Sequence, residues 1–174
     1  MINNSRESVI AVLIICAVWI AFTACGKGAG KSDGEPGVKF TVTDLKSGKV
    51  INGEDLRGKV VLVDFWATWC KPCIEEFPAF NELVKQYQSR GFEIIGISLD
   101  EGGEADVRPF MAKHQMDYYV ALGNPEVNKL FAAEGSPLPL TILIDRKGKI
   151  RNRHVGFTRK EVFEKEILEL LAES

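Results

Sequence analysis

The sequence is poor in the features that bind nucleic acids, nucleotides and metals. Its 22 basic and 24 acidic residues are mixed along the chain and leave a formal net charge of −2. It has no basic stripe and no glycine-rich phosphate loop, so neither a nucleic-acid partner nor a nucleotide cofactor is expected. It has two histidines. A zinc site of Cys70, Cys73, His114 and His154 would lack the usual ligand spacing, so no metal is expected.

Cysteine is also scarce. The four cysteines are Cys16, Cys25, Cys70 and Cys73, which excludes a scaffold held together by many disulfides. Cys16 and Cys25 lie in or at the end of an apolar N-terminal segment, so a single pair remains in the body of the protein. With 174 residues, 45% of them hydrophobic, the chain is long enough for one domain with a core and a short appendage.

The appendage begins with an apolar run, Val9 to Phe22. A secretory signal has an apolar region of about 7–15 residues and a membrane span needs about 20, so residues 1–24 are predicted to be a signal peptide or a membrane anchor. The run ends in Phe-Thr-Ala-Cys, which resembles a bacterial lipoprotein processing box with Cys25 as the lipidated residue. An uncleaved anchor extending to Gly26 is the alternative.

The glycine-rich residues 25–37 are predicted to form a flexible tether, which leaves residues 38–174 as one extracytoplasmic domain. Its hydrophobic pattern predicts the order ββ, βαβ, an α insertion, and ββα. The expected strands are 40–45, 49–51, 59–67, 92–99, 138–144 and 149–155, and the expected helices begin at Pro72, Glu104, Asn124 and Thr158. Thr158 and Glu161 have the spacing of a capping box for the last helix.

Cys70 and Cys73 lie between an apolar strand and a helix, a position that favours redox chemistry over half of a zinc site. The helix N-terminus and Lys71 are expected to lower the pKa of Cys70 and so favour its nucleophilic thiolate. Cys73, one turn further into the helix, is expected to be less exposed and to resolve the mixed disulfide that Cys70 forms. Trp69 is expected to pack beside the sulfurs, and Trp66 to be an ordinary core residue.

Resolution requires a proton acceptor for Cys73, and a buried carboxylate with a raised pKa is suited to this task. Asp64 is the one charged residue in the apolar run from Val60 to Trp66, and Glu76 follows Cys73 by one helical turn. A strand residue hydrogen-bonded at the sheet end and a solvated helix residue are the alternative interpretations of Asp64 and Glu76.

Two segments carry a family resemblance. Val63 to Cys73, followed by Glu-Glu-Phe-Pro, and Ser136 to Asp145 resemble the active-site segments of thioredoxin-fold proteins, and most closely those of the membrane-tethered TlpA/ResA group of thiol–disulfide oxidoreductases. The resemblance implies a central mixed sheet flanked by helices, an N-terminal hairpin and a βα insertion at 101–122. It also implies that Glu76 is an active-site residue and that Pro139 is a cis proline, with Leu138 pairing with the substrate.

The resemblance implies a reductant for disulfides of exported proteins, such as the haem-binding cysteines of apocytochrome c. Its electrons would come from a membrane thiol donor. A thiol oxidase or isomerase is the first alternative, because sequence does not fix direction. A metal-delivery module on the same fold is the second, but the cysteines of such a module usually have three residues between them, whereas Cys70 and Cys73 have two, and His154 is the only plausible distal ligand. A peroxidase requires Thr-x-x-Cys, whereas Thr68 precedes Cys70 by two residues.

Overall fold

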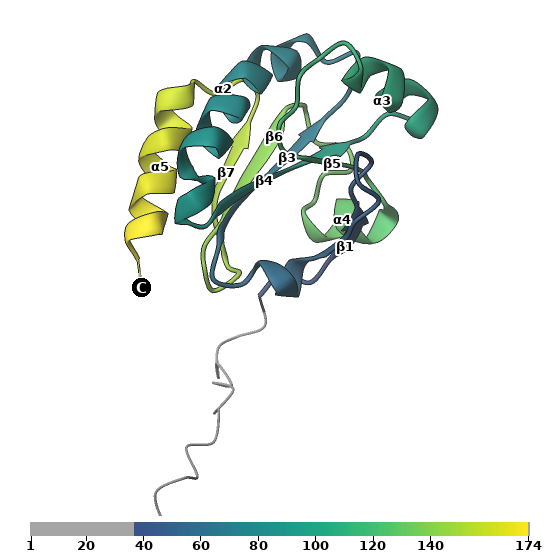
Figure 1. The fold of residues 1–174 in the computed structure, drawn as a ribbon. Coiled ribbons are helices and arrows are strands. Elements are labelled where there is room, and N and C mark those ends of the chain that lie inside the picture. Colours follow the sequence, from purple (N-terminus) through teal and green to yellow (C-terminus); the bar gives the residue numbers. More distant parts are fainter. Residues whose placement is uncertain (1–36, 174) are drawn as a thin grey trace, which may run out of the picture. The chain divides into compact units, whose positions relative to one another are not determined.

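The computed structural model describes residues 37–173 (Figure 1). The predicted signal or anchor, Cys25 and the tether up to residue 36 lie outside these described residues. The strands are β1 (Thr41–Thr43), β2 (Val50–Asn52), β3 (Val60–Trp66), β4 (Phe92–Ser98), β5 (Tyr119–Leu122), β6 (Leu140–Ile144) and β7 (Ile150–Val155). The α-helices are α2 (Lys71–Tyr87), α3 (Glu104–Met111), α4 (Pro125–Leu130) and α5 (Lys160–Ala172), and short 3-10 helices span Gly53–Leu56 and Gln88–Arg90. None of these helices combines the length and the apolarity that crossing a bilayer requires.

Five strands form one mixed sheet in the order β5-β4-β3-β6-β7. β4 runs parallel to β3 and β5, whereas β6 runs antiparallel to β3 and β7. β1 and β2 pair as a separate antiparallel hairpin. The predicted α/β fold, with a central mixed sheet and an N-terminal hairpin, is therefore confirmed.

The two faces of β3 belong to two hydrophobic cores. Val60, Leu62 and Trp66 pack with residues of α2 and α5, which lie side by side on one face of the sheet (Figure 1). The intervening apolar residues of β3 pack with the hairpin and α4 on the other face. Because side chains alternate along a strand, Asp64 points into the same layer as Leu62 and Trp66. The strand register therefore directs the Asp64 carboxyl group toward α2.

The start of the last helix differs from the prediction. α5 begins at Lys160 with Arg159 as its N-cap, and no side chain caps it. The predicted capping box of Thr158 and Glu161 is therefore wrong. Thr158 lies one residue before the N-cap, and its backbone N–H donates to Glu76 Oε1 at 2.7 Å instead. The predicted cap of α4 is confirmed, since the Asn124 side chain accepts a hydrogen bond from the N–H of Val127.

The stretch 101–122, where the resemblance implied a βα insertion, contains α3 followed by β5, so its helix precedes its strand. The hydrophobic pattern alone missed β5. This strand has four residues, lies at the sheet edge and, among the strands of residues 37–173, pairs with β4 alone. Such a short segment does not show enough alternation to be distinguished from a loop.

Candidate active site

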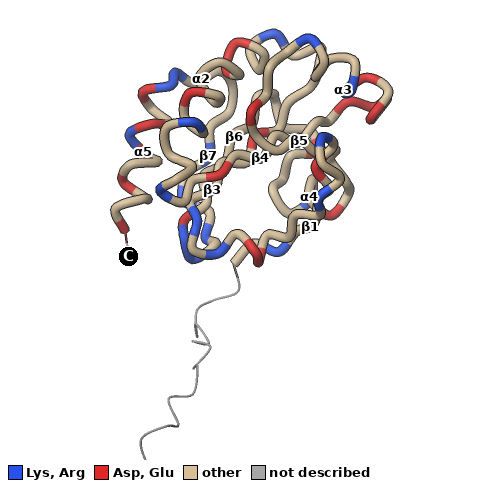
Figure 2. Tube along the Cα trace, viewed as in Figure 1, with Lys and Arg blue, Asp and Glu red and all other residues tan. Residues whose placement is uncertain are grey.

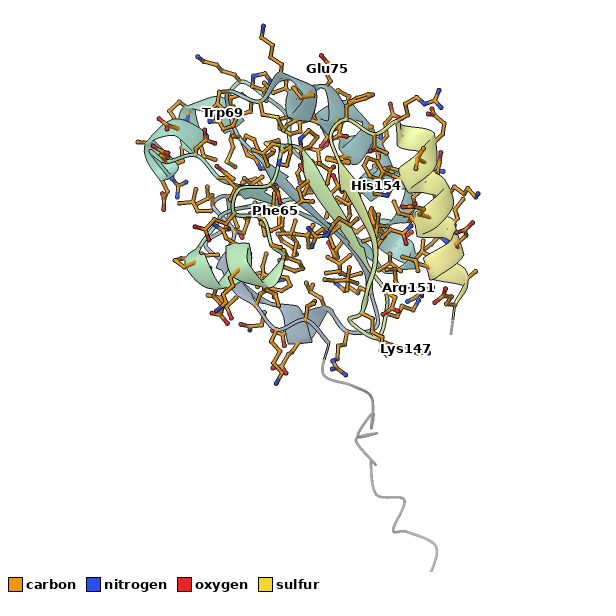
Figure 3. All side chains as sticks on the ribbon, turned by 180° about the vertical axis from the view of Figure 1, so that it is seen from behind. Phe65, Trp69, Glu75, Lys147, Arg151 and His154 are labelled. Carbon is orange, nitrogen blue, oxygen red and sulfur yellow. A yellow bond between two sulfur atoms is a disulfide. The ribbon has the colours of Figure 1, made fainter. Side chains whose placement is uncertain are left out.

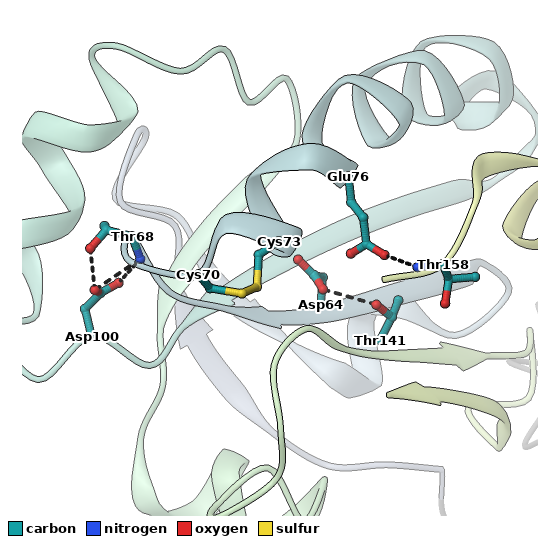
Figure 4. Close-up of a disulfide and its surroundings, with 8 residues drawn as sticks. All are labelled: Asp64, Thr68, Cys70, Cys73, Glu76, Asp100, Thr141 and Thr158. Atoms are coloured by element: carbon teal, nitrogen blue, oxygen red, sulfur yellow. Dashed lines mark hydrogen bonds between the residues drawn. A yellow bond between two sulfur atoms is a disulfide. The ribbon is translucent and has the colours of Figure 1, made fainter. Parts of the chain in front are cut away.

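The reactive pair lies where α2 begins. Cys70 is the N-cap residue of α2, and a disulfide joins it to Cys73 with the Cα atoms 5.4 Å apart (Figure 4). Pro72 occupies the first turn, where a helix makes no use of the missing N–H. Cys70 is 4% exposed and Cys73 is fully buried. Cys70 is thus the sulfur that a partner reaches more easily, as the sequence predicts.

Asp100 holds the turn that precedes Cys70. Its carboxylate accepts hydrogen bonds from the Thr68 N–H at 3.0 Å and the Thr68 hydroxyl at 2.6 Å (Figure 4). The hydroxyl of Ser98 donates to the same carboxylate at 2.7 Å. These bonds fasten the active-site turn to the end of β4. Sequence reasoning missed this role, because the pairing of residues 32 positions apart has no local signal.

Asp64 and Glu76 are brought together on the Cys73 side of the disulfide (Figure 4). Asp64 is 0% exposed and Glu76 is 1% exposed. The Thr141 hydroxyl donates to Asp64 Oδ1 at 3.2 Å, and the N–H of Thr158 holds Glu76 Oε1. The second carboxyl oxygen of each residue has no hydrogen-bond partner in the described part of the chain. Buried carboxyl groups with so few donors are poorly stabilised as anions.

Burial raises the pKa of Asp64 to about 7, against a smaller opposing effect of the Thr141 hydrogen bond. Burial, together with the negative charge of Asp64, raises the pKa of Glu76 to about 8, and the hydrogen bond from Thr158 opposes this shift. Because the two groups interact, the protons leave the pair in two coupled steps. Near neutral pH the pair can therefore hold and exchange a proton with a thiol, whose ordinary pKa is about 8.5.

The other predicted site residues differ in their burial. The Leu138–Pro139 peptide bond is cis, the geometry that the resemblance implied. Leu138 packs against the core cluster that contains both cysteines. Trp66 is buried in that cluster, whereas Trp69 is 69% exposed, so most of its ring faces solvent rather than the protein.

The histidines are engaged elsewhere. His154 Nε2 lies 2.8 Å from Glu166 Oε2, and His114 stacks on Phe110. Within residues 37–173, no three His, Cys, Asp or Glu side chains are grouped as a metal site would require. The structure does not bring Cys70, Cys73 and the histidines together as zinc ligands.

A mixed sheet that leads into a Cys-x-x-Cys pair at a helix start, together with a cis proline, defines a thiol–disulfide oxidoreductase of the thioredoxin fold. This class accounts for every part of the site described above. The chain belongs to the AhpC/TSA family, whose model matches residues 34–153.

Curated relatives and solved structures agree with this class. The chain is 38% identical to the thiol-disulfide oxidoreductase ResA of a Bacillus cereus strain, over 93% of this chain and 94% of that protein. It is 35% identical to ResA of Bacillus subtilis (strain 168), over 83% and 80%. A putative thiol:disulfide interchange protein DsbE from Chlorobium tepidum superposes with a TM-score of 0.70 at 34% identity, over 80% of this chain and 97% of that one. The predicted kinship with ResA is confirmed.

Proposed function

We propose that this protein is a membrane-tethered, extracytoplasmic reductant of disulfides in exported proteins. The observation that carries the proposal is the Cys70–Cys73 pair at the start of α2, backed by the buried carboxyl groups of Asp64 and Glu76. The 35–40% identity to several ResA proteins supports the same chemistry. The TlpA/ResA resemblance suggests the haem-binding cysteines of apocytochrome c as clients.

The reaction starts from the reduced pair. The Cys70 thiolate attacks one sulfur of the client disulfide, a bond forms between these two sulfurs, and the second client sulfur leaves as a thiolate and takes up a proton. Cys73 then gives its proton to the pair formed by Asp64 and Glu76 and attacks Cys70 Sγ. The bond between Cys70 and the client breaks, and the client sulfur leaves as a thiolate and takes up a proton. The client is released as a dithiol, and two electrons have moved from the enzyme to the client. The enzyme is left with the Cys70–Cys73 disulfide that the structure shows.

A second two-electron transfer must restore the dithiol. The sequence has no nicotinamide-binding motif, so the donor is proposed to be a membrane thiol carrier. Leu138 and Pro139 are proposed to bind the client backbone, with Trp69 as an adjacent apolar contact.

The direction of electron flow is tested by the redox equilibrium of the pair. The midpoint potential of Cys70–Cys73 is expected to be more negative than about −200 mV, in the range of reducing thioredoxin-fold proteins. The measurement is alkylation of the free thiols after equilibration in thiol–disulfide buffers of known potential. A midpoint potential of about −120 mV, as in strong oxidants, supports the oxidase alternative and excludes a reductant. Isomerisation of a scrambled disulfide substrate tests the isomerase alternative.

The tether is tested with Cys25→Ser. The natural protein is expected to fractionate with membranes and to incorporate labelled fatty acid, and the variant is expected to lose the label. Membrane retention without label in both proteins assigns the apolar run as a peptide anchor instead. A natural protein found wholly in the soluble extracytoplasmic fraction contradicts a tether of either kind.

A further inference from the structure

A cavity of about 770 Å³ opens beside the disulfide. Two of its lining residues adjoin the active site in the sequence, since Trp69 directly precedes Cys70 and Leu138 directly precedes Pro139. The remaining walls come from the end of β4 and its connection to α3, from Leu122 and Gly123 at the end of β5, and from Asn128 of α4 with the connection from α4 to β6. We call this space the side cavity. Its position beside the proposed nucleophile means that a client chain attacked by Cys70 must pass over or into it.

The side cavity is acidic. Asp100, Glu101 and Glu134 line it, and no Lys, Arg or His is among the described residues that do so. This excess of negative charge is local to the side cavity, because basic and acidic residues are both distributed over the rest of the domain (Figure 2). A bound segment with a positive side chain would therefore meet attraction here, and a segment with a negative one would meet repulsion.

Two of the three carboxylates that line the side cavity have no hydrogen bond or ion pair within residues 37–173 that would compete with a client. Asp100 is committed to Thr68 and Ser98. Glu101 and Glu134 are exposed, and within residues 37–173 no hydrogen bond or ion pair engages either of them. Their charges are thus available to select among clients.

Two further groups in the wall favour a ligand that donates hydrogen bonds and carries positive charge. The side-chain oxygen of Asn128 is buried, and no donor of the described chain reaches it. A buried acceptor of this kind is normally satisfied by a partner. The exposed ring of Trp69 offers a face to an apolar stem or a cation.

Building on the proposed reductase function, we propose that the side cavity binds the client segment that flanks the reacting disulfide and selects clients with Lys or Arg within a few residues of that cysteine. An extended chain advances about 3.3 Å per residue, so a residue two to four positions away lies about 7–13 Å from the client sulfur. Glu101 and Glu134 are the specificity-determining residues.

The test uses three disulfide-bonded peptides that differ only in having Lys, Ala or Glu at one position, three residues from the cysteine. Each is mixed with the pre-reduced full chain in detergent, and the second-order rate of Cys70–Cys73 oxidation is measured. The Lys peptide is expected to react about tenfold faster than the Glu peptide at low salt. The ratio is expected to shrink at high ionic strength, because salt screens exposed charges.

In the double variant Glu101→Gln, Glu134→Gln the ratio is expected to fall to about twofold or less. Glu75→Gln is the matched control, since Glu75 is an exposed carboxylate near the start of α2 that does not line the side cavity and lies apart from Trp69 (Figure 3). This control is expected to keep the tenfold ratio.

Each failure has a different meaning. Equal rates for the Lys and Glu peptides overturn the selection of basic clients and leave the reductase proposal intact. A preference that survives in the double variant, or that disappears in Glu75→Gln, overturns the assignment to the side cavity. If none of the peptides oxidises the enzyme, the proposed reductase function fails, and this inference fails with it.

Discussion

Cys70→Ser is expected to abolish client reduction, with a loss of at least about a thousandfold, because a serine hydroxyl neither ionises near neutral pH nor forms a mixed disulfide. Reduction of insulin or of a disulfide peptide, with dithiothreitol as the electron source, measures this loss. Cys70 is at the N-cap position of α2, and the other described thiol, Cys73, is fully buried and therefore less able to meet a client.

Cys73→Ser is the matched variant, and its expected behaviour is different. Cys70 can still attack a client, but no second sulfur then releases it, so the mixed disulfide should accumulate and be detected by mass. The same experiment in cells identifies the clients. Equal activity of the two serine variants, or trapping through Cys73 rather than Cys70, contradicts the assigned order of attack.

Glu76→Gln is expected to slow the resolution step about tenfold or more at pH 8 and above, where Glu76 is ionised, and to have less effect near pH 6, where Glu76 is already protonated, because the variant loses a proton acceptor for Cys73. The rate is measured by stopped-flow release of a labelled peptide from its mixed disulfide with Cys70. In the natural protein this rate should rise with pH through the region of about 7 to 8, where the pKa values of Asp64 and Glu76 lie.

The sign of the change separates two roles of Glu76. A carboxylate that only repelled the Cys73 thiolate would hold back its ionisation, so its removal would speed resolution. A carboxylate that takes the proton gives the opposite result. A variant that is as fast as, or faster than, the natural protein at every pH therefore rules out proton transfer to Glu76.

Asp64→Asn is expected to have a similar but smaller effect, because Glu76 still remains as an acceptor. The two changes should not be additive, since the charge of Asp64 contributes to the raised pKa of Glu76. The double variant measures this coupling. Strictly additive effects would show that the two carboxyl groups act independently.

Much of the site could be predicted from the sequence, because its main parts are local. Cys70, Cys73 and Glu76 are separated by single helical turns, so their spacing alone places them on one side of α2. Asp64 is conspicuous within an apolar strand for the same reason. The relation between Asp64 and Glu76 is not local. Whether the two carboxyl groups act alternatively or as a pair depends on how α2 packs on β3.

The errors also arise from long-range contacts. Thr158 and Glu161 have the spacing of a capping box, but the N–H of Thr158 is used by Glu76, 82 residues away. The hydrogen bonds from Thr68 to Asp100 likewise join residues that the parallel pairing of β3 and β4 brings together. Sequence patterns indicate local preferences. A contact with a residue distant in the sequence overrides such a preference where it offers a backbone group a different hydrogen-bond partner.

The contacts of the loop between β7 and α5 have one more consequence. The N–H of Gly156 donates to the carbonyl of Pro139 at 2.8 Å, and two residues later Thr158 holds Glu76. Two hydrogen bonds thus connect Pro139, in the proposed client-binding segment, to the carboxyl group of Glu76 through the loop between β7 and α5. A client that displaces residues 138–139 would shift the loop that carries Gly156 and Thr158. If this weakens the hydrogen bond from Thr158 to Glu76, the pKa of Glu76 rises further. Binding of a client would then be coupled to uptake of a proton by Glu76.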